Sequence, residues 1–166
     1  LRPRFSGIHF FNPPRYMPLV ELVAAPATDP ALVDALETFL TSTLGKGAIR
    51  AQDTPNFVAN RIGVFSILST MIHTARLGLG FDTVDALTGP SIGRAKSATF
   101  RTADVVGLDT MAHVIRTMQE TLPAKLDPFA EHFATPPVLK ALVEKGALGQ
   151  KAGAGFYRKD GRTIKV

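Results

Sequence analysis

The sequence predicts a mainly α-helical chain that opens with a small β-β-α-β segment. Short apolar runs bounded by Pro and Gly fall between residues 6 and 51, a pattern typical of strands. Beyond Thr54, longer stretches carry apolar residues at helical spacing. We therefore expect two parts, residues 1–54 with the strands and residues 55–166 with most of the helices.

Three strands are expected in the first part. Residues 6–12 have the composition of a short buried strand, which should stop at Pro13 because proline cannot donate to a sheet ladder. Residues 18–24 and 47–51 predict the second and third strands. A unit this small rarely stands alone. We expect it to be the edge of a larger sheet whose other strands precede Leu1, so that the chain begins inside a larger protein.

A helix should connect the second and third strands. Asp29 is a suitable N-cap and Pro30 suits the first helical position. Gly45 is a suitable residue to end the helix, since glycine adopts the left-handed conformation common at helix C-termini. Apolar residues follow the cap at helical spacing, namely Leu32, Ala35, Leu36, Phe39 and Leu40.

A long helix should open the second part. Thr54 can cap it and Pro55 suits its first turn. From Phe57 to about Leu79 the residues are apolar nearly all round, which predicts a buried helix. A hairpin turning on Asp160-Gly161 should close the chain. Between them we expect helices at residues 82–88, 102–121 and 136–146.

The composition limits the classes of function. The 166 residues suffice for one domain and a piece of another, and no apolar run approaches the ~18 residues of a membrane span. No cysteine is present, which excludes disulfides and thiol nucleophiles and fits a reducing cytoplasm. No HExxH or similar spacing occurs, so we expect no metal site.

The net charge of +5 is compatible with a phosphorylated ligand such as coenzyme A or NAD. Because the Lys and Arg residues form no run and have no interleaved aromatics, the pattern does not favour nucleic acid. A solvated basic surface without a partner remains the alternative.

His9 and Glu21 are the first candidates for chemistry. A lone histidine in an apolar strand is more often a core residue, but Glu21 lies in an equally apolar strand, where a carboxylate is costly to bury unless it is paired. We therefore expect the two to pair. Glu21 would fix the imidazole tautomer and favour the imidazolium, which leaves the other ring nitrogen to take a proton. A base and an orienting carboxylate without a nucleophile suit proton removal from an alcohol.

Three further features leave two interpretations open. Asn12 is either a turn residue before Pro13 or a ligand contact. Asn60 lies in the first turns of the apolar helix, where it either bonds a neighbouring loop or contacts a ligand. The glycine-rich segment 149–155 resembles a phosphate cradle but lacks the order of a P-loop, so its residues alone predict a flexible connector. No GxGxxG occurs, so the chain cannot by itself hold a dinucleotide in the usual way.

The strings Gly7-Ile-His-Phe-Phe-Asn-Pro13 and Met17-Pro-Leu-Val-Glu21 resemble the active-site segment of the 3-hydroxyacyl-CoA dehydrogenases of β-oxidation. Later blocks resemble the same family in the same order: Asp53-Thr-Pro-Asn-Phe-Val-Ala-Asn-Arg61, Gly107-Leu-Asp-Thr110 and Gly149-Gln-Lys-Ala-Gly-Ala-Gly-Phe-Tyr157. Residues 92–102 resemble a long bacterial subgroup in which an enoyl-CoA hydratase region is fused to the dehydrogenase.

The resemblance implies a fold and a set of roles. Residues 1–54 would be the last part of a Rossmann-like dinucleotide-binding domain and residues 55–166 the helical substrate-binding and dimerisation domain. The family's catalytic histidine and its glutamate partner fall on His9 and Glu21. Its active-site asparagines fall on Asn12 and Asn60. Both would bind substrate, and Asn12 would also lie near the cofactor. Its NAD-contacting lysine falls on Lys151. The family's GxGxxG and active-site serine have no counterpart and are expected before Leu1.

The implied reaction is the oxidation of an (S)-3-hydroxyacyl-CoA by NAD to the 3-oxoacyl-CoA. A homodimer through the helical domain and a cytoplasmic location are further expectations, and the isolated chain is expected to be inactive because it lacks the cofactor-binding motif. Three alternatives stay open: a non-catalytic helical dimerisation module, an acyl-CoA-binding protein without redox chemistry, and a 3-hydroxybutyryl-CoA dehydrogenase.

Overall fold

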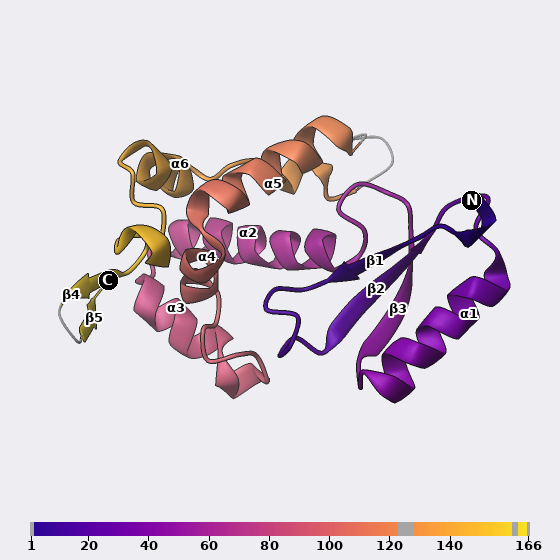
Figure 1. Cartoon of the computed structure of the whole chain (residues 1–166). Helices are drawn as coiled ribbons and strands as arrows, with labels where there is room; N and C mark the ends of the chain where they lie inside the picture. The colour runs from indigo at the N-terminus through magenta and orange to yellow at the C-terminus, as the bar shows by residue number, and fades with distance from the viewer. Residues whose placement is uncertain (1, 123–127, 161–162, 166) are drawn as a thin grey trace. The chain divides into compact units, whose positions relative to one another are not determined.

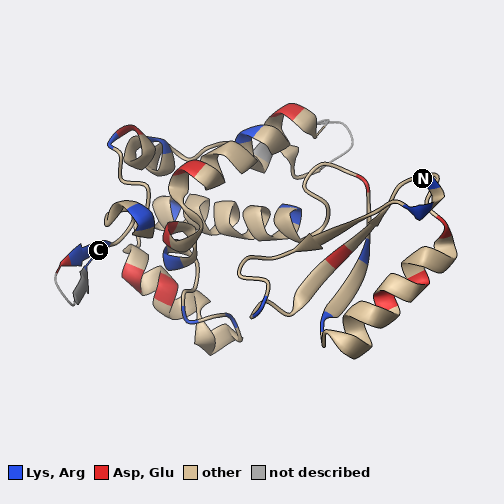
Figure 2. Ribbon diagram, in the orientation of Figure 1, with Lys and Arg blue, Asp and Glu red and all other residues tan. Residues whose placement is uncertain are grey.

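The computed structural model describes residues 2–122, 128–160 and 163–165. The chain forms two compact units, Leu1–Asn60 and Arg61–Val166 (Figure 1). No helix among the described residues is both long and apolar enough to cross a membrane. Lys and Arg occur on most elements and do not gather in one segment (Figure 2).

The first unit contains a three-stranded sheet and one helix. The strands β1 (Ser6–Phe10), β2 (Leu19–Ala24) and β3 (Gly47–Gln52) lie in the order β1-β2-β3. β1 is antiparallel to β2, and β2 is parallel to β3. The predicted β-β-α-β order is confirmed, although β1 ends at Phe10, two residues before the predicted end, where its ladder with β2 stops at the Phe10–Val20 pair.

Helix α1 (Pro30–Thr38) joins the two parallel strands, as predicted. The carboxylate of Asp29 accepts the N–H of Ala31 at 2.9 Å and so caps the first turn. The helix continues through a π-helical turn, Phe39–Thr43, and the chain reverses at Gly45, whose φ of +64° is the left-handed conformation expected after a helix. The small core of this unit is formed by Val20, Leu22, Val33 and Leu40.

The long helix α2 (Ala59–Leu77) begins later than predicted. Thr54 and Pro55 were expected to open it, but Asn56 and Phe57 have φ of 60° and 50°. A right-handed helix cannot include residues with positive φ. The segment 55–58 is therefore a turn, in which the N–H of Phe57 bonds the carbonyl of Thr54 at 3.0 Å.

The second unit is helical apart from a terminal hairpin. Its short 3-10 turns are Pro90–Ile92, Ala130–His132 and Gln150–Ala152. The hairpin pairs β4 (Arg158–Asp160) with β5 (Thr163–Lys165) in antiparallel register, as predicted, and the turn residues 161–162 lie outside the described residues. After α2, the elements are α3 (Phe81–Thr88), α4 (Phe100–Val106), α5 (Leu108–Thr121), α6 (Pro137–Glu144), β4 (Arg158–Asp160) and β5 (Thr163–Lys165).

Two helix predictions for this unit are wrong. The expected helix 102–121 is two helices, α4 and α5, separated by Gly107, whose φ of +97° breaks the right-handed path. The expectation that α2 is buried all round also fails. Leu68 and Met71 are buried, but Ile62 and Leu77 are 64% and 66% exposed, because one face of the helix packs into the core of the unit while the opposite face remains exposed in this chain.

The core of the second unit is built around aromatic and aliphatic side chains from α2 to the segment before β4. Phe81, Phe100 and Phe156 contact one another with ring centroids 4.7–5.0 Å apart. The buried residues around them include Leu68, Met71, Leu108, Met111, Ile115, Met118 and Leu139. The segment that follows α6 is thereby anchored in the same core as the helices.

Candidate active site

His9 and Glu21 lie directly opposite each other on the antiparallel strands β1 and β2. His9 Nδ1 is 2.6 Å from Glu21 Oε2. The glutamate side chain is fully buried, whereas 31% of the histidine side chain is exposed. Because the carboxylate engages Nδ1, Nε2 is the ring nitrogen that remains for other chemistry. The sequence-based expectation that the two residues pair therefore agrees with the geometry.

The second carboxylate oxygen of Glu21 is also occupied. Oε1 accepts the backbone N–H groups of Val58 and Ala59, each at 2.9 Å. Burial raises the pKa of Glu21, but the hydrogen bond from His9 and the two backbone donors outweigh it, and the pKa is lowered overall. The carboxylate is thus held charged and in one orientation, with one oxygen for each set of donors.

Two aromatic rings bound the imidazole. The ring centroid of Phe11 lies 4.6 Å from that of His9, and the ring centroid of Phe57 lies 5.5 Å away. Sequence reasoning singled out neither phenylalanine, nor the amides of Val58 and Ala59. The available signal is the Pro55-Asn56 pair before α2, since Pro and Asn are both common in turns. Pro also suits the first turn of a helix, which is the alternative that Thr54-Pro55 favours.

The two asparagines occupy different settings. Asn12 is exposed in the loop after β1, and its peptide bond to Pro13 is cis. Asn60 is half-buried in the first turn of α2. Within the described residues, no hydrogen bond joins either side chain to His9 or Glu21. Both asparagines belong to the first unit with the His9–Glu21 pair.

Lys151 belongs to the second unit and is exposed in the 3-10 turn before β4. Its Nζ lies 2.6 Å from Oδ2 of Asp109, in the first turn of α5. The hydrogen bond from Lys151 is the main cause that lowers the pKa of Asp109. The lysine is therefore paired locally, and Asp109 is a neighbour that the sequence analysis did not identify.

The glycine-rich segment around Lys151 is held in place, contrary to the flexible connector that its residues alone predicted. The N–H of Gly149 bonds the carbonyl of Ala154 at 2.7 Å. The N–H groups of Phe156 and Tyr157 each donate to the carboxylate of Asp104 at 2.9 Å. The pKa of Asp104 is raised overall, because the effect of burial exceeds the opposite effect of these two N–H donors. The segment is fixed by contacts distant in sequence, which local composition does not show.

A second buried carboxylate, Asp85 on α3, ties the same segment to α4. Asp85 accepts the N–H groups of Thr99, Phe100 and Arg101 at 2.7–3.0 Å, and the hydroxyl of Tyr157 at 2.9 Å. The burial of the phenol and its bond to Asp85 raise the pKa of Tyr157 above its ordinary value. Sequence reasoning missed Asp85 and Asp104, since an acidic residue within a helix usually faces solvent.

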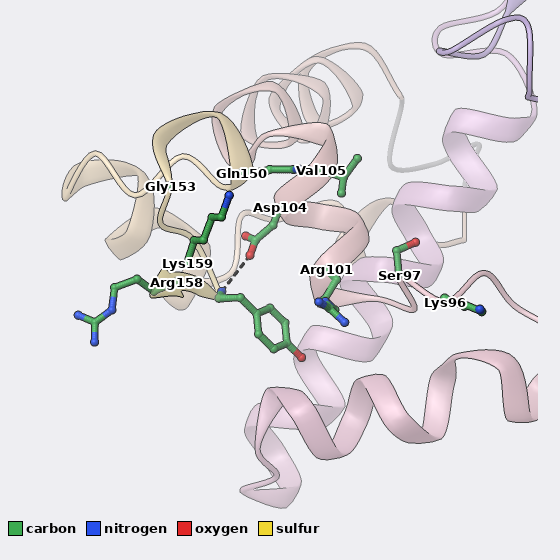
Figure 3. Close-up of a pocket in the computed structure, with 10 residues that line it drawn as sticks. Lys96, Ser97, Arg101, Asp104, Val105, Gln150, Gly153, Arg158 and Lys159 are labelled. Carbon is green, nitrogen blue, oxygen red and sulfur yellow. Dashed lines mark hydrogen bonds between the residues drawn. The ribbon is translucent and has the colours of Figure 1, made fainter. Parts of the chain in front are cut away.

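A pocket of about 490 Å³ lies in the second unit beside this network (Figure 3). Its cations are Lys96, Arg101, Arg158 and Lys159, and Arg101 lies over the ring of Tyr157 at 5.5 Å. In Figure 3 Arg158 and Lys96 point away from the pocket centre on opposite sides, so the four cations do not converge on one point. Its remaining lining residues are Ser97, Asp104, Val105, Gln150, Gly153 and Tyr157.

The described residues hold part of what a nicotinamide cofactor requires. No strand of the three-stranded sheet leads through a glycine-rich turn into a helix, so these residues offer no cradle for a pyrophosphate. They do offer an imidazole, His9, that is held by Glu21 at Nδ1 and is partly exposed. No group of His and carboxylate residues that could hold a metal ion occurs in the part of the chain that the structure describes.

Comparison with known families matches nearly the whole chain. Residues 2–54 match the NAD binding domain of 3-hydroxyacyl-CoA dehydrogenase, and residues 57–159 match the C-terminal domain of 3-hydroxyacyl-CoA dehydrogenase. A probable 3-hydroxyacyl-CoA dehydrogenase of Bacillus subtilis is 47% identical over 98% of this chain, and one of Deinococcus radiodurans is 48% identical over 94%. The chain spans only 20% and 44% of the lengths of these two relatives.

Solved structures give the same result. FadB2 of Mycobacterium tuberculosis is 35% identical, with a TM-score of 0.81 over 95% of this chain and 53% of its own. The (S)-3-hydroxybutyryl-CoA dehydrogenase PaaH1 of Ralstonia eutropha is 30% identical, with a TM-score of 0.79 over the same shares. The matched domains, the sequence identities and the shared fold together show that this chain belongs to the 3-hydroxyacyl-CoA dehydrogenase family.

Proposed function

We propose that the protein containing this chain is an NAD-dependent (S)-3-hydroxyacyl-CoA dehydrogenase of fatty-acid β-oxidation, which oxidises the 3-hydroxyl group to the 3-oxoacyl-CoA. The observation that carries the proposal is the His9–Glu21 pair, a partly exposed imidazole held on a buried carboxylate. The family membership supplies the substrate class and the cofactor.

His9 acts as the base in this proposal. Its Nε2 takes the proton of the substrate hydroxyl while the hydrogen on the same carbon leaves as hydride, and in the reverse direction the protonated ring returns the proton. Glu21 holds Nδ1, fixes the ring orientation and stabilises the positive charge that forms on the imidazole. NAD, when bound, supplies the hydride acceptor.

The other sites follow from the family. We assign Asn12 and Asn60 to substrate positioning, with Asn12 also facing the cofactor, and Lys151 to the cofactor. Residues 1–54 would form part of a dinucleotide-binding domain, and residues 55–166 would form the substrate-binding and dimerisation domain. A fused enoyl-CoA hydratase region, as in the long bacterial subgroup, is part of the same proposal.

Homodimerisation through the helical domain is a further element of the proposal. Large apolar side chains on the second unit are unusually exposed, which is typical of surfaces that associate. They are Ile62, Leu77, Leu87, Ile92 and Val105, each 58–66% exposed. Sedimentation of the full-length protein tests this association.

A cytoplasmic location fits the absence of cysteine from the sequence.

Chain-length preference distinguishes the main alternative. A 3-hydroxybutyryl-CoA dehydrogenase of M. tuberculosis is 36% identical over 93% of this chain. A kcat/KM that is highest for the four-carbon substrate and falls with acyl length would favour that specificity. A non-catalytic dimerisation or acyl-CoA-binding module predicts no NADH formation with any acyl length.

The decisive experiment measures NADH formation by the full-length protein and by its His9→Gln variant. Loss of the base should lower kcat by about 10²–10⁴-fold, with KM little changed. A matched control is Lys140→Gln, since this exposed lysine of α6 pairs only loosely with Glu144 at 3.9 Å. Near-normal kcat in His9→Gln would reject His9 as the base and, with it, the proposed mechanism.

A further inference from the structure

The turn that leads into α2 contains two consecutive residues in the left-handed conformation. Asn56 has φ of 60° and Phe57 has φ of 50°. Asparagine tolerates this region, because its short polar side chain can bond locally. Phenylalanine does not, and a bulky residue with positive φ is an outlier in proteins. Such conformations persist only where the surrounding structure over-determines them, and they concentrate at functional sites.

The two residues that follow this turn contact the candidate active site. Val58 and Ala59 each donate a backbone N–H to Glu21 Oε1 at 2.9 Å. We call these two N–H groups the Glu21 clip. A carboxylate can rotate about its last bond, so the clip on one oxygen fixes the plane of the group and keeps the other oxygen directed at His9. The other oxygen, Oε2, is the one at 2.6 Å from Nδ1.

We propose that Phe57 is a positioning residue whose left-handed backbone aims the Glu21 clip at one carboxylate oxygen, so that the carboxylate is held in one orientation with its other oxygen directed at His9. This inference rests on the proposed function, because it needs His9 to be the base. The role belongs to the Phe57 backbone and is separate from the contact between the Phe57 and His9 rings. The clip consists of two uncharged backbone amides. Among the described hydrogen-bond partners of the Glu21 carboxylate, His9 is the titratable one.

Two substitutions of Phe57 separate this role from packing. Both Phe57→Gly and Phe57→Val remove the ring. Glycine adopts positive φ without steric cost and keeps the clip in place. Valine is β-branched and strongly disfavours that conformation. A packing role predicts that glycine is the worse substitution because it leaves the larger void, whereas positioning through the backbone predicts that valine is worse.

The measurement is kcat and KM of the full-length protein for each variant. We expect kcat of Phe57→Val to be about tenfold below that of Phe57→Gly. This factor corresponds to the loss of one hydrogen bond to a charged group. KM should be similar in the two variants, since the clip touches no substrate. Circular dichroism shows whether each variant is folded, and equal kcat or the reverse order in folded variants overturns the proposal.

Ala59→Pro tests the clip without touching Phe57. Proline removes one N–H of the clip and suits the first position of α2. Ala31→Pro is the matched control, because it removes a first-turn N–H that donates to another carboxylate, Asp29, at 2.9 Å. We expect kcat to fall about tenfold in Ala59→Pro and to stay at the wild-type value in Ala31→Pro. Equal kcat in these two variants contradicts the role of the clip.

A double-mutant cycle shows whether the turn acts through Glu21. In a Glu21→Ala background the carboxylate is absent, so Ala59→Pro should change kcat by less than about twofold. A loss that persists in full in this background means that the turn acts on the fold in general, and the inference fails. If instead His9→Gln retains normal kcat, the proposed function itself fails, and the two failures are thereby distinguished.

Discussion

Asp85 and Tyr157 are 72 residues apart in the sequence and are joined by a hydrogen bond of 2.9 Å from the phenol to the carboxylate. The same Asp85 oxygen, Oδ2, accepts the N–H of Arg101. This bond links α3, the start of α4 and the segment before β4. It therefore fixes the position of the glycine-rich segment that contains Lys151.

The first prediction removes this bond. Tyr157→Phe deletes only the hydroxyl and should lower the free energy of unfolding by about 1.5–3 kcal/mol, the range for hydrogen bonds to charged groups. Denaturant unfolding of wild type and variant gives the difference. Tyr16→Phe is the matched control, because Tyr16 is 75% exposed and its change should be near zero. Equal losses in the two variants would show that the Asp85 bond contributes nothing specific.

The second prediction concerns the backbone of Gly149. Its φ is +92°, and a Cβ there would clash with the carbonyl oxygen of Asp104. Gly149→Ala should therefore destabilise the protein by about 1–3 kcal/mol or more. Gly63→Ala, inside α2 with open space around it, should instead stabilise by about 0.5–1 kcal/mol. Thermal unfolding that shifts the two variants in the same direction would contradict this account.

The third prediction concerns stability at low pH. The pKa of Glu21 is below its ordinary value of 4.5 in the folded state, so its charged form favours folding. The contribution is complete above about pH 4.5 and is lost as the pH falls through the lower folded pKa. Glu21→Gln should remove this contribution, so its unfolding temperature should fall less steeply than that of wild type below about pH 4.5. Parallel curves for the two proteins would show that Glu21 is not the group responsible.

The fourth prediction concerns Lys151, which pairs with Asp109 on the surface of the second unit. An exposed ion pair contributes little to stability, so Lys151→Gln should leave the unfolding temperature almost unchanged. If the lysine contacts the cofactor as proposed, KM for NAD should rise about tenfold in the full-length protein while kcat changes little. A variant with lower stability and unchanged KM would indicate a structural role instead.

Local patterns in the sequence were sufficient for most of the secondary structure. Asp29-Pro30 predicted the start of α1, and short apolar runs bounded by Pro and Gly predicted the three strands. The errors arose where backbone conformation departs from what composition suggests. Phe57 has a positive φ that its residue type does not predict, and Gly107 breaks a helix whose apolar spacing continues on both sides. Each conformation depends on contacts made after the chain has folded.

The sequence alone determined that His9 and Glu21 are paired candidates, because a carboxylate in an apolar strand is costly to bury unless it is paired. Their surrounding motif also determined the family. The tertiary structure alone decided how the two carboxylate oxygens divide between His9 and the Glu21 clip, and which acids hold the segment around Lys151. Glu21 is 37 and 38 residues from its clip donors, and Asp104 is 52 and 53 residues from its own. Donor and acceptor pairs at such separations are set by the folded backbone, and local composition carries no signal for them.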